Sequence, residues 1–421
     1  MEMINFQSMA AGAFAAGSDR IRVGVIGCGS RGTGAAKNCV ESSPNVEIVA
    51  LGDTFKDRLE TCLKSLKTND AAEKSEWSAA GPWRHADKVT ATPETCFTGF
   101  DAYKKVIACD VDLVLLTAPP HFRPIHLKAA IEAGKHVFME KPVAVDPVGI
   151  RSILASSELA KQKGLAIVAG TQRRHDPQYI EVMKRVHAGQ IGDLLGGECY
   201  WVQGWVRQWG FWHERKPEWT DMEWQVRNWY YFTWLSGDHL VEQHVHNIDV
   251  INWAMGTPPV QIMSLGGRQV RTEPEFGNIY DHFGVEFEYP NGARVLSMAR
   301  QITGCTDIIG ERVVGATGTA RAGVIEGQNP YTYNGPRPNP YEQEHANLIA
   351  GIRSGKPLNE GRQVAESTLC AIAGRMSAYT GREMKYEWVL KASKLDLSPK
   401  DYKFGSIPVA PVATPGQTPL T

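Results

Sequence analysis

The sequence predicts an α/β protein in two parts: a doubly wound parallel sheet, and then an α/β domain with a large open sheet that is mainly antiparallel or mixed. From residue 21 to 142, short β-branched apolar runs alternate with helical stretches, a pattern typical of a parallel sheet covered on both faces. Beyond residue 142, alternating polarity favours strands with one buried face. We expect a disordered or leader segment, a first domain, a second domain and an extended arm over residues 1–20, 21–145, 146–390 and 391–421.

The strands of the first part are short and apolar, and helical stretches separate them. This continuous apolar character indicates strands that are buried on both faces, as in a parallel sheet. The four runs are residues 21–26, 46–51, 112–116 and 136–139.

The second part begins with a predicted helix over residues 147–163 and an apolar strand over 165–169. Residues 283–298 alternate in polarity around Asn291-Gly292, which predicts a β-hairpin with one buried face. Two further helices are expected over 341–354 and 363–380. Prolines at positions 408, 411, 415 and 419 favour an extended arm after them.

The composition is that of an ordinary globular protein and excludes several classes of partner. Hydrophobic residues make up 43% and charged residues 22% of the 421 positions, and the formal net charge is −1, so nucleic acid is not an expected partner. No run approaches the roughly 20 apolar residues of a membrane span. The eight cysteines show no C-x-x-C spacing, which argues against a structural zinc site and a disulfide framework.

The sequence is compatible with more than one cellular compartment. Residues 9–17 are small and apolar, like the end of an export signal, but no basic segment precedes them. The protein is cytoplasmic as the sequence stands and periplasmic if the start has lost its leading residues; a disordered tail is the other interpretation.

A glycine-rich turn closes the first predicted strand and opens a helix: Gly27-Cys28-Gly29-Ser30-Arg31-Gly32. Gly27 permits the tight turn, Gly29 lets the backbone approach a pyrophosphate, and Gly32 permits close packing of helix on strand. The helix N-terminus then faces the anion. The turn therefore predicts a dinucleotide site.

Asp53 ends the next strand, about twenty residues further on, where a carboxylate can accept hydrogen bonds from ribose hydroxyls. Because this carboxylate repels a 2′-phosphate, we predict NAD rather than NADP. Arg31 and Lys56 are the two residues that could support a phosphate instead. Other residues expected at the cofactor are Thr117, Pro119, Glu140, Lys141 and Arg174.

The tripeptide Glu140-Lys141-Pro142 follows the last apolar strand of the first part. A charged pair in this position is usually a solvated strand end. Next to a dinucleotide site, however, Lys141 would lie where a hydride is exchanged, so we predict a catalytic role for it.

Residues 238–255 have helical periodicity and stop at Gly256. His239, Glu242, His246 and Asp249 recur at steps of three and four, so one helix face should carry all of them. Three interpretations compete: a hydrogen-bonded core face, a metal site of His239, Glu242 and His246, and a general base. We favour the base and expect no metal.

These motifs together resemble the Gfo/Idh/MocA oxidoreductases over about residues 21–381. The resemblance rests on the glycine turn, Glu140-Lys141-Pro142, the run Gly170-Thr171-Gln172-Arg173-Arg174 and the run His246-Asn247-Ile248-Asp249. It implies an N-terminal Rossmann domain that binds NAD(P) and a C-terminal domain whose open sheet also serves oligomerisation. A homodimer or homotetramer is expected.

The resemblance also implies roles for single residues. The family's lysine falls on Lys141 and its helix histidine on His246. Its helix aspartate falls on Glu242, which is longer by one methylene. The run Tyr341-Glu342-Gln343-Glu344-His345 is similar to a branch often found near carbohydrate-processing genes.

Eight of the twelve tryptophans lie between residues 201 and 234. Indole rings beside Arg, Asn and His side chains complement the apolar faces and hydroxyl edges of a saccharide, although any single Trp can simply pack the core or an interface. The substrate residues expected from this region and the helix are Arg227, Asn228, Trp229, His239 and His246.

We therefore predict an NAD-dependent oxidoreductase acting on a hydroxyl of a sugar, cyclitol or glycoside, with Lys141, His246 and Glu242 as catalytic residues. One alternative is a glycoside hydrolase that keeps its NAD and works by transient oxidation and elimination. The other is a non-catalytic NAD-dependent binding or sensor protein, expected if His246 and Glu242 face away from the nicotinamide.

Overall fold

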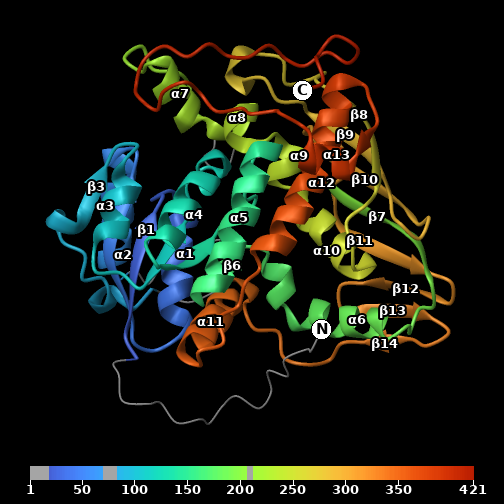
Figure 1. Cartoon of the computed structure of the whole chain (residues 1–421), viewed down its shortest axis with the longest axis horizontal. Helices are drawn as coiled ribbons and strands as arrows, with labels where there is room; N and C mark the ends of the chain where they lie inside the picture. The colour runs from blue at the N-terminus through green and yellow to red at the C-terminus, as the bar shows by residue number, and fades with distance from the viewer. Residues whose placement is uncertain (1–18, 70–82, 206–211) are drawn as a thin grey trace.

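The structure, a computed structural model, describes residues 19–69, 83–205 and 212–421 and contains two sheets with helices packed between and around them (Figure 1). The predicted leader segment falls outside these residues except for positions 19 and 20.

The first sheet has six parallel strands in the order β3-β2-β1-β4-β5-β6. This is a doubly wound sheet, as predicted. The strand order reverses between β1 and β4, and at such a point the carboxyl ends of the strands open a crevice. The strands are β1 Ile21–Ile26, β2 Val46–Asp53, β3 Cys96–Thr98, β4 Leu113–Leu116, β5 His136–Met139 and β6 Ile167–Ala169.

The helices of this part connect its strands. In α5, the predicted helix over 147–163 is confirmed: Asp146 caps its start by accepting a hydrogen bond from the amide of Gly149 at 2.7 Å, and Gly164 ends it in a left-handed conformation. The helices are α1 Ser30–Ser42, α2 Lys56–Lys67, α3 Ala102–Ala108, α4 Arg123–Glu132 and α5 Pro147–Lys163.

The strand expected over residues 165–169 belongs to the first sheet and not to the second part. It forms β6, which pairs in parallel with β5. The chain reaches β6 through α5, a connection of the same strand–helix–strand kind that precedes it. The first sheet therefore extends beyond the boundary that we expected at residue 145.

The second sheet has nine strands in the order β14-β13-β12-β11-β7-β10-β9-β8-β15. Its central pair, β7 and β10, is parallel and the other pairs are antiparallel, so the predicted mixed sheet is confirmed. The predicted hairpin is β9 and β10, with Gly292 at a positive φ of 83° in its turn. The strands are β7 Leu194–Gln203, β8 Gln261–Gly267, β9 His282–Glu288, β10 Arg294–Gln301, β11 Ile308–Gly315, β12 Gly318–Arg321, β13 Val324–Gly327, β14 Tyr331–Thr332 and β15 Met384–Lys385.

Helix α12 lies between the two sheets, where it contacts β8 and β9 on one side and α5 and β6 on the other (Figure 1). Helix α11 returns to the first part and packs on α1. The remaining helices are α6 Pro177–His187, α7 Asp221–Arg227, α8 Thr233–Ser236, α9 His239–Glu242, α10 Val245–Met255, α11 Pro340–Arg353, α12 Gly361–Thr380 and α13 Tyr386–Lys391.

The single helix predicted over residues 238–255 is wrong, because the chain forms two helices, α9 and α10, with a turn between them. At the break, the amide of His246 bonds to the carbonyl of Gln243 instead of to that of Glu242. The carbonyl of Glu242 accepts a hydrogen bond from the ammonium group of Lys141 at 2.6 Å. A contact from the other domain thus replaces one helical hydrogen bond.

Residues 392–421 form an extended arm across the upper side of the molecule in Figure 1. The arm bonds to both parts of the chain. The amide of Leu397 donates to Asp146 at 2.9 Å, Tyr402 bonds to His121 at 2.8 Å, and the carbonyl of Ala413 accepts from Tyr280 at 2.8 Å.

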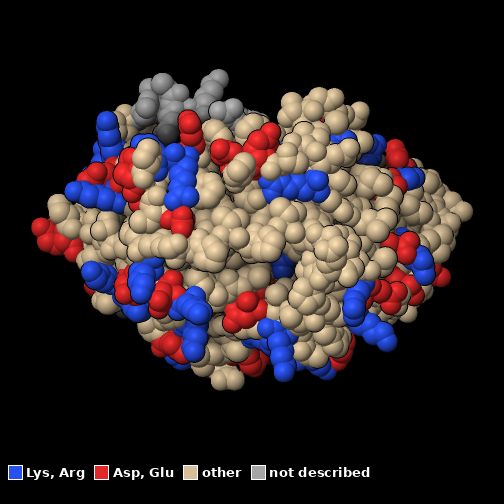
Figure 2. Space-filling view, turned by 90° about the horizontal axis from the view of Figure 1, so that it is seen from above, with Lys and Arg blue, Asp and Glu red and all other residues tan. Residues whose placement is uncertain are grey.

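Aromatic residues of the arm pack on the first part. The ring of Phe404 lies 5.9 Å from that of Phe55 and 5.3 Å from that of Phe100, and the ring of Tyr402 lies 5.8 Å from that of Phe122. Figure 2 views the molecule from this side: charges of both signs are interspersed near the edge, and uncharged residues fill a broad band across the middle.

Candidate active site

A cavity lies at the carboxyl ends of β1, β2, β4 and β5 and is lined by residues of both parts of the chain. The volume of the cavity is about 200 Å³. Its position is the crevice expected at the reversal of strand order in a doubly wound sheet, where such folds bind ligands.

The glycine turn forms one wall of this cavity. Gly27 has a φ of 104°, and a Cβ on Gly32 would lie 1.8 Å from the carbonyl oxygen of Gly27, so the turn cannot hold larger residues at these two positions. A Cβ on Gly29 would meet only a guanidinium nitrogen of Arg58, at 3.8 Å. The backbone at Gly29, where α1 begins, is therefore open to a ligand.

Asp53 borders the same cavity at the end of β2. Its carboxylate accepts hydrogen bonds from the amides of Cys28, at 2.6 Å, and Phe55, at 2.8 Å. Burial raises the pKa of Asp53, and these two amides oppose the shift. Cys28 is buried and contributes its amide to this contact.

Neither residue proposed as an alternative phosphate ligand lies beside Asp53. The side chain of Lys56 is 79% exposed and pairs with Glu60, whereas Arg31 turns toward Glu140. Sequence reasoning missed Arg58, which borders the cavity and lies 3.2 Å from Nε2 of His213.

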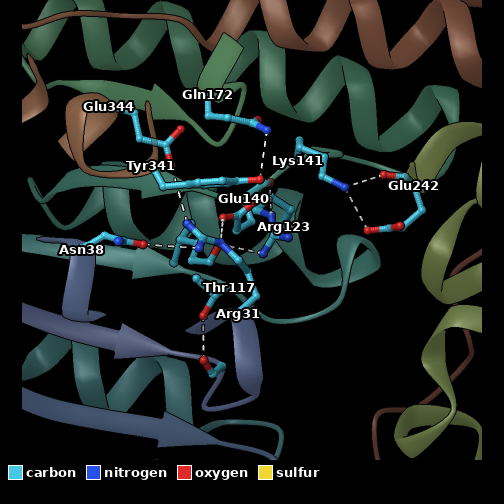
Figure 3. Close-up of polar contacts among 12 residues, drawn as sticks. Arg31, Asn38, Thr117, Arg123, Glu140, Lys141, Gln172, Glu242, Tyr341 and Glu344 are labelled. Atoms are coloured by element: carbon cyan, nitrogen blue, oxygen red, sulfur yellow. Dashed lines mark hydrogen bonds and ion pairs between the residues drawn. The ribbon is translucent and has the colours of Figure 1, made fainter. Parts of the chain in front are cut away.

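The side chain of Arg31 points away from the glycine turn and belongs to a polar cluster that includes residues of α11 (Figure 3). It forms an ion pair with Glu140, lies 3.6 Å from Glu344, and stacks its guanidinium 5.0 Å from the ring centre of Tyr341. The hydroxyl of Tyr341 accepts a hydrogen bond from Gln172 at 3.0 Å. Tyr341 and Gln172 both border the cavity, although neither was predicted to have a role there.

Lys141 and Glu242 both border the cavity, and their side chains are in contact (Figure 3). Nζ of Lys141 donates to the carbonyl oxygen of Glu242 at 2.6 Å and lies 3.0 Å from its Oε1. Burial raises the pKa of Glu242, and the ammonium of Lys141 opposes this. Oε2 of Glu242 is buried and has no partner among the described residues.

His246, at the start of α10, borders the same cavity and stacks on Trp201 of β7, with 5.7 Å between the ring centres and 25° between the planes. Burial lowers the pKa of His246 well below its usual 6.5, and the positive charges of Lys141 and Arg173 lower it further. The imidazole is therefore neutral at pH 7 and able to accept a proton.

Several predicted residues lie elsewhere. Arg174 forms a paired contact with Asp249, at 2.7 and 2.9 Å, and neither borders the cavity. His239 is buried against Phe283, with neither ring nitrogen partnered among the described residues. It also does not border the cavity, so the expectation that it faces substrate with His246 is not met.

The tryptophan-rich segment divides between the cavity and the core. Trp229 and Trp201 border the cavity. Arg227 pairs with Asp57 and Glu223, and Asn228 bonds to the backbone of His213, so both hold the segment in place. Trp224 packs in a hydrophobic core, and Trp209 lies outside the described residues.

The three remaining predicted cofactor residues, Ser30, Thr117 and Pro119, border the cavity, and Thr117 bonds to the carbonyl of Gly27 at 2.6 Å. Within the described ranges, no group of three or more His, Cys, Asp or Glu side chains is arranged to hold a metal ion. None of the helices in those ranges has the length and hydrophobicity to cross a membrane.

Comparison with known proteins gives matches along most of the chain. Residues 21–171 match a family profile described as oxidoreductase family, NAD-binding Rossmann fold, GFO/IDH/MocA, and residues 179–321 match the GFO/IDH/MocA C-terminal domain.

Similar curated proteins include a scyllo-inositol 2-dehydrogenase (NAD(+)) of Bacillus subtilis, 24% identical over 74% of this chain and 76% of the relative. Inositol 2-dehydrogenase 3 of Saccharopolyspora erythraea is 31% identical over 65% of each chain. A solved structure of scyllo-inositol dehydrogenase from Lactobacillus casei, with bound NAD(H) and scyllo-inositol, superposes with a TM-score of 0.63 at 17% identity and covers 87% of this chain and 99% of its own, which shows a common fold.

Proposed function

Because the chain belongs to the GFO/IDH/MocA family of oxidoreductases, we propose that it is a dehydrogenase that moves a hydride between NAD and a hydroxyl group of a sugar, cyclitol or glycoside. One observation carries the proposal. Lys141 and His246, far apart in the sequence and on different domains, border the cavity that also holds Gly29 and Asp53.

The residues of the cavity fit a dinucleotide. The open backbone at Gly29 and the start of α1 suit a pyrophosphate, and the carboxylate of Asp53 suits ribose hydroxyls. Bound NAD supplies the acceptor for a hydride. Lys141, at the end of β5, lies in the same crevice, so a substrate held beside it is close to the cofactor.

In the proposed mechanism, the neutral imidazole of His246 takes the proton of the reacting hydroxyl. Lys141 places its positive charge beside the oxygen and stabilises the alkoxide as it develops. Glu242 orients the ammonium group through both its carbonyl and its carboxylate. Trp201 fixes the plane of the imidazole by stacking on it.

A screen for NADH formation over free sugars, cyclitols and aryl glycosides tests this function. NADH that accumulates with a free sugar or cyclitol is the expected result. Cleavage of an aryl glycoside without net NADH would assign the NAD-retaining hydrolase instead. No reaction across the whole panel by protein loaded with NAD would favour the non-catalytic binding protein.

The wild-type protein should bind NAD more tightly than NADP, and Asp53→Ser should weaken NAD binding by about 10- to 100-fold, because hydrogen bonds to a charged group contribute about 1.5–3 kcal/mol. Isothermal titration with both dinucleotides measures this. Asp57→Ser is the control, since that carboxylate belongs to the same segment but pairs with Arg227. Tighter binding of NADP by the wild type would contradict the assignment.

The proposed enzyme is a homo-oligomer that assembles through the open face of the second sheet. On this face Leu265 is 72% exposed, and Met263, Leu296 and Met298 are exposed beside it. In register, Leu265 of β8 and Met298 of β10 both flank Gly284 of β9. Helices α10 and α12 pack on the opposite face, and an apolar surface of this kind favours protein contact.

Leu265→Glu combined with Met298→Glu should convert the oligomer into monomers, which light scattering after gel filtration measures. Charges in the centre of an apolar interface cost much of its binding free energy. Val270→Glu is the matched control, because Val270 is exposed but lies outside the strands. A wild-type monomer, or an oligomer unaffected by the double change, would refute the interface.

A further inference from the structure

Arg123 is a buried cation in the wall of the cavity that neither the sequence motifs nor the mechanism above accounts for. It begins α4 and is 1% exposed. Its Nε donates to the carbonyl of Glu140 and its Nη1 to the carbonyl of Leu116, each at 2.8 Å. The side chain therefore joins the ends of β4 and β5 immediately before Lys141, as Figure 3 shows.

The guanidinium of Arg123 forms no ion pair among the described residues, although the negative charges of Glu140 and Glu242 lie near enough to favour its charged form. Across the described ranges, its hydrogen bonds are to the two backbone carbonyls, and Nη2 donates to neither. Three partly buried arginines near the cavity do pair with carboxylates: Arg31 with Glu140, Arg173 with Glu311 and Arg174 with Asp249. A buried charge without an ion pair is costly, so we expect an anion to reach Arg123.

The carboxylates at this end of the cavity pair with cations other than Arg123. Glu140 forms an ion pair with Arg31, and Glu242 forms one with Lys141. Burial raises the pKa of Glu344, and the cation nearest to this carboxyl is Arg31, at 3.6 Å. Burial lowers the pKa of Arg123 to about 10, which leaves it charged at pH 7. Of the three cations at this end of the cavity, Arg123 is the one without an ion pair among the described residues.

The position of Arg123 indicates which kind of anion could pair with it. A pyrophosphate belongs at the glycine turn, near Gly29, whereas Arg123 borders the cavity at the ends of β4 and β5, next to Lys141. Arg123 bonds to the carbonyl of the residue before Lys141, so a substrate whose hydroxyl lies beside Lys141 would present a carboxylate to this part of the cavity wall. The planar fork of arginine suits a carboxylate.

We propose that Arg123 binds a carboxylate of the substrate, so that the substrate class is a sugar or cyclitol acid such as a hexuronate. The inference rests on the proposed function, since it assumes that a hydroxyl compound reacts at Lys141. It makes Arg123 a specificity residue: the charge selects the acid, and the two carbonyl contacts fix the direction of the guanidinium.

The test compares D-glucuronate and D-galacturonate with D-glucose and D-galactose, using NAD-loaded protein. The wild type should prefer the acids by on the order of 10- to 10²-fold in kcat/KM, the range for a hydrogen-bonded charge. Arg123→Gln keeps a donor for the carbonyls but not the charge, and it should lose this preference mainly through KM for the acids. Arg123→Lys should keep part of it.

Arg151→Gln is the matched control. Arg151 also bonds to two backbone carbonyls, those of Leu390 and Ser393, each at 3.0 Å, but it does not border the cavity. This variant should keep the acid preference. If Arg123→Gln does not fold, as a melting curve would reveal, the wild-type preference and the Arg123→Lys variant decide the question.

The remaining outcomes separate the inference from the proposed function. Neutral hexoses that react as well as the acids overturn the inference and leave the dehydrogenase standing. An equal loss on acids and hexoses in Arg123→Gln also overturns it, because the residue then acts on every substrate alike. If no sugar reacts, calorimetric binding to the NAD-loaded protein decides: tighter binding of the acids supports the inference, and no preference or no binding overturns it.

Discussion

Lys141→Ala should lower kcat by on the order of 10²–10³, the usual effect of removing a positioned charge that stabilises a transition state. The physical reason lies in its burial and its two bonds to Glu242, which hold the ammonium in one place in the cavity. Such a charge needs no reorganisation when the alkoxide forms. Steady-state NADH formation with the best substrate of the screen measures the effect.

Lys135→Ala is the matched control for this prediction. Lys135 precedes the same strand, β5, at its opposite end, and its ammonium also bonds to a backbone carbonyl, that of Val111. Loss of Lys135 should leave kcat unchanged. A Lys141→Ala protein that binds NAD normally and turns over at the wild-type rate would exclude Lys141 from catalysis.

His246→Asn should reduce kcat/KM by on the order of 10²–10⁴, the range for loss of a general base. In the wild type the base form is the neutral imidazole. Because burial and Lys141 lower the pKa of His246 well below 6.5, this form persists below the pH at which an ordinary histidine is protonated. The rate should therefore stay on its plateau as pH falls through 6.5 and decline only in more acid solution.

In His246→Asn, the rate should be low at every pH and should no longer fall in acid solution. His187→Asn is the control, because His187 is exposed and bonds to the carbonyl of Trp253, away from the cavity. An acid limb near pH 6.5 in the wild type, or one that survives in His246→Asn, would assign the titration to another group.

Local chemistry made part of the site predictable from sequence. The glycine turn and Asp53 depend on short spacings within a strand–turn–helix unit, so their neighbourhood follows from local structure. Lys141 directly follows the last apolar strand before α5, so its place at the end of that strand can also be predicted from local sequence. In the structure Gly29, Asp53 and Lys141 border one cavity.

The parts that depend on distant contacts could not be predicted in this way. The break between α9 and α10 is a clear case: the pattern of apolar residues continues through it, but Lys141 takes the carbonyl that would continue the helix. Tyr341 and Arg123 are further cases. Their sequence neighbours suggest ordinary helix starts, and their place in the cavity wall depends on how α11 and α4 pack.

The extended arm has a consequence for how the protein is made. Tyr402 and Phe404 cover Phe55, Phe100 and Phe122, which belong to the part of the chain synthesised first. On the ribosome, the cofactor domain therefore emerges before α7, α8 and the arm, which all pack on these rings, and the rings stay open to aggregation or chaperone binding until those segments follow. Expressed alone, the first domain would keep this aromatic surface exposed to solvent.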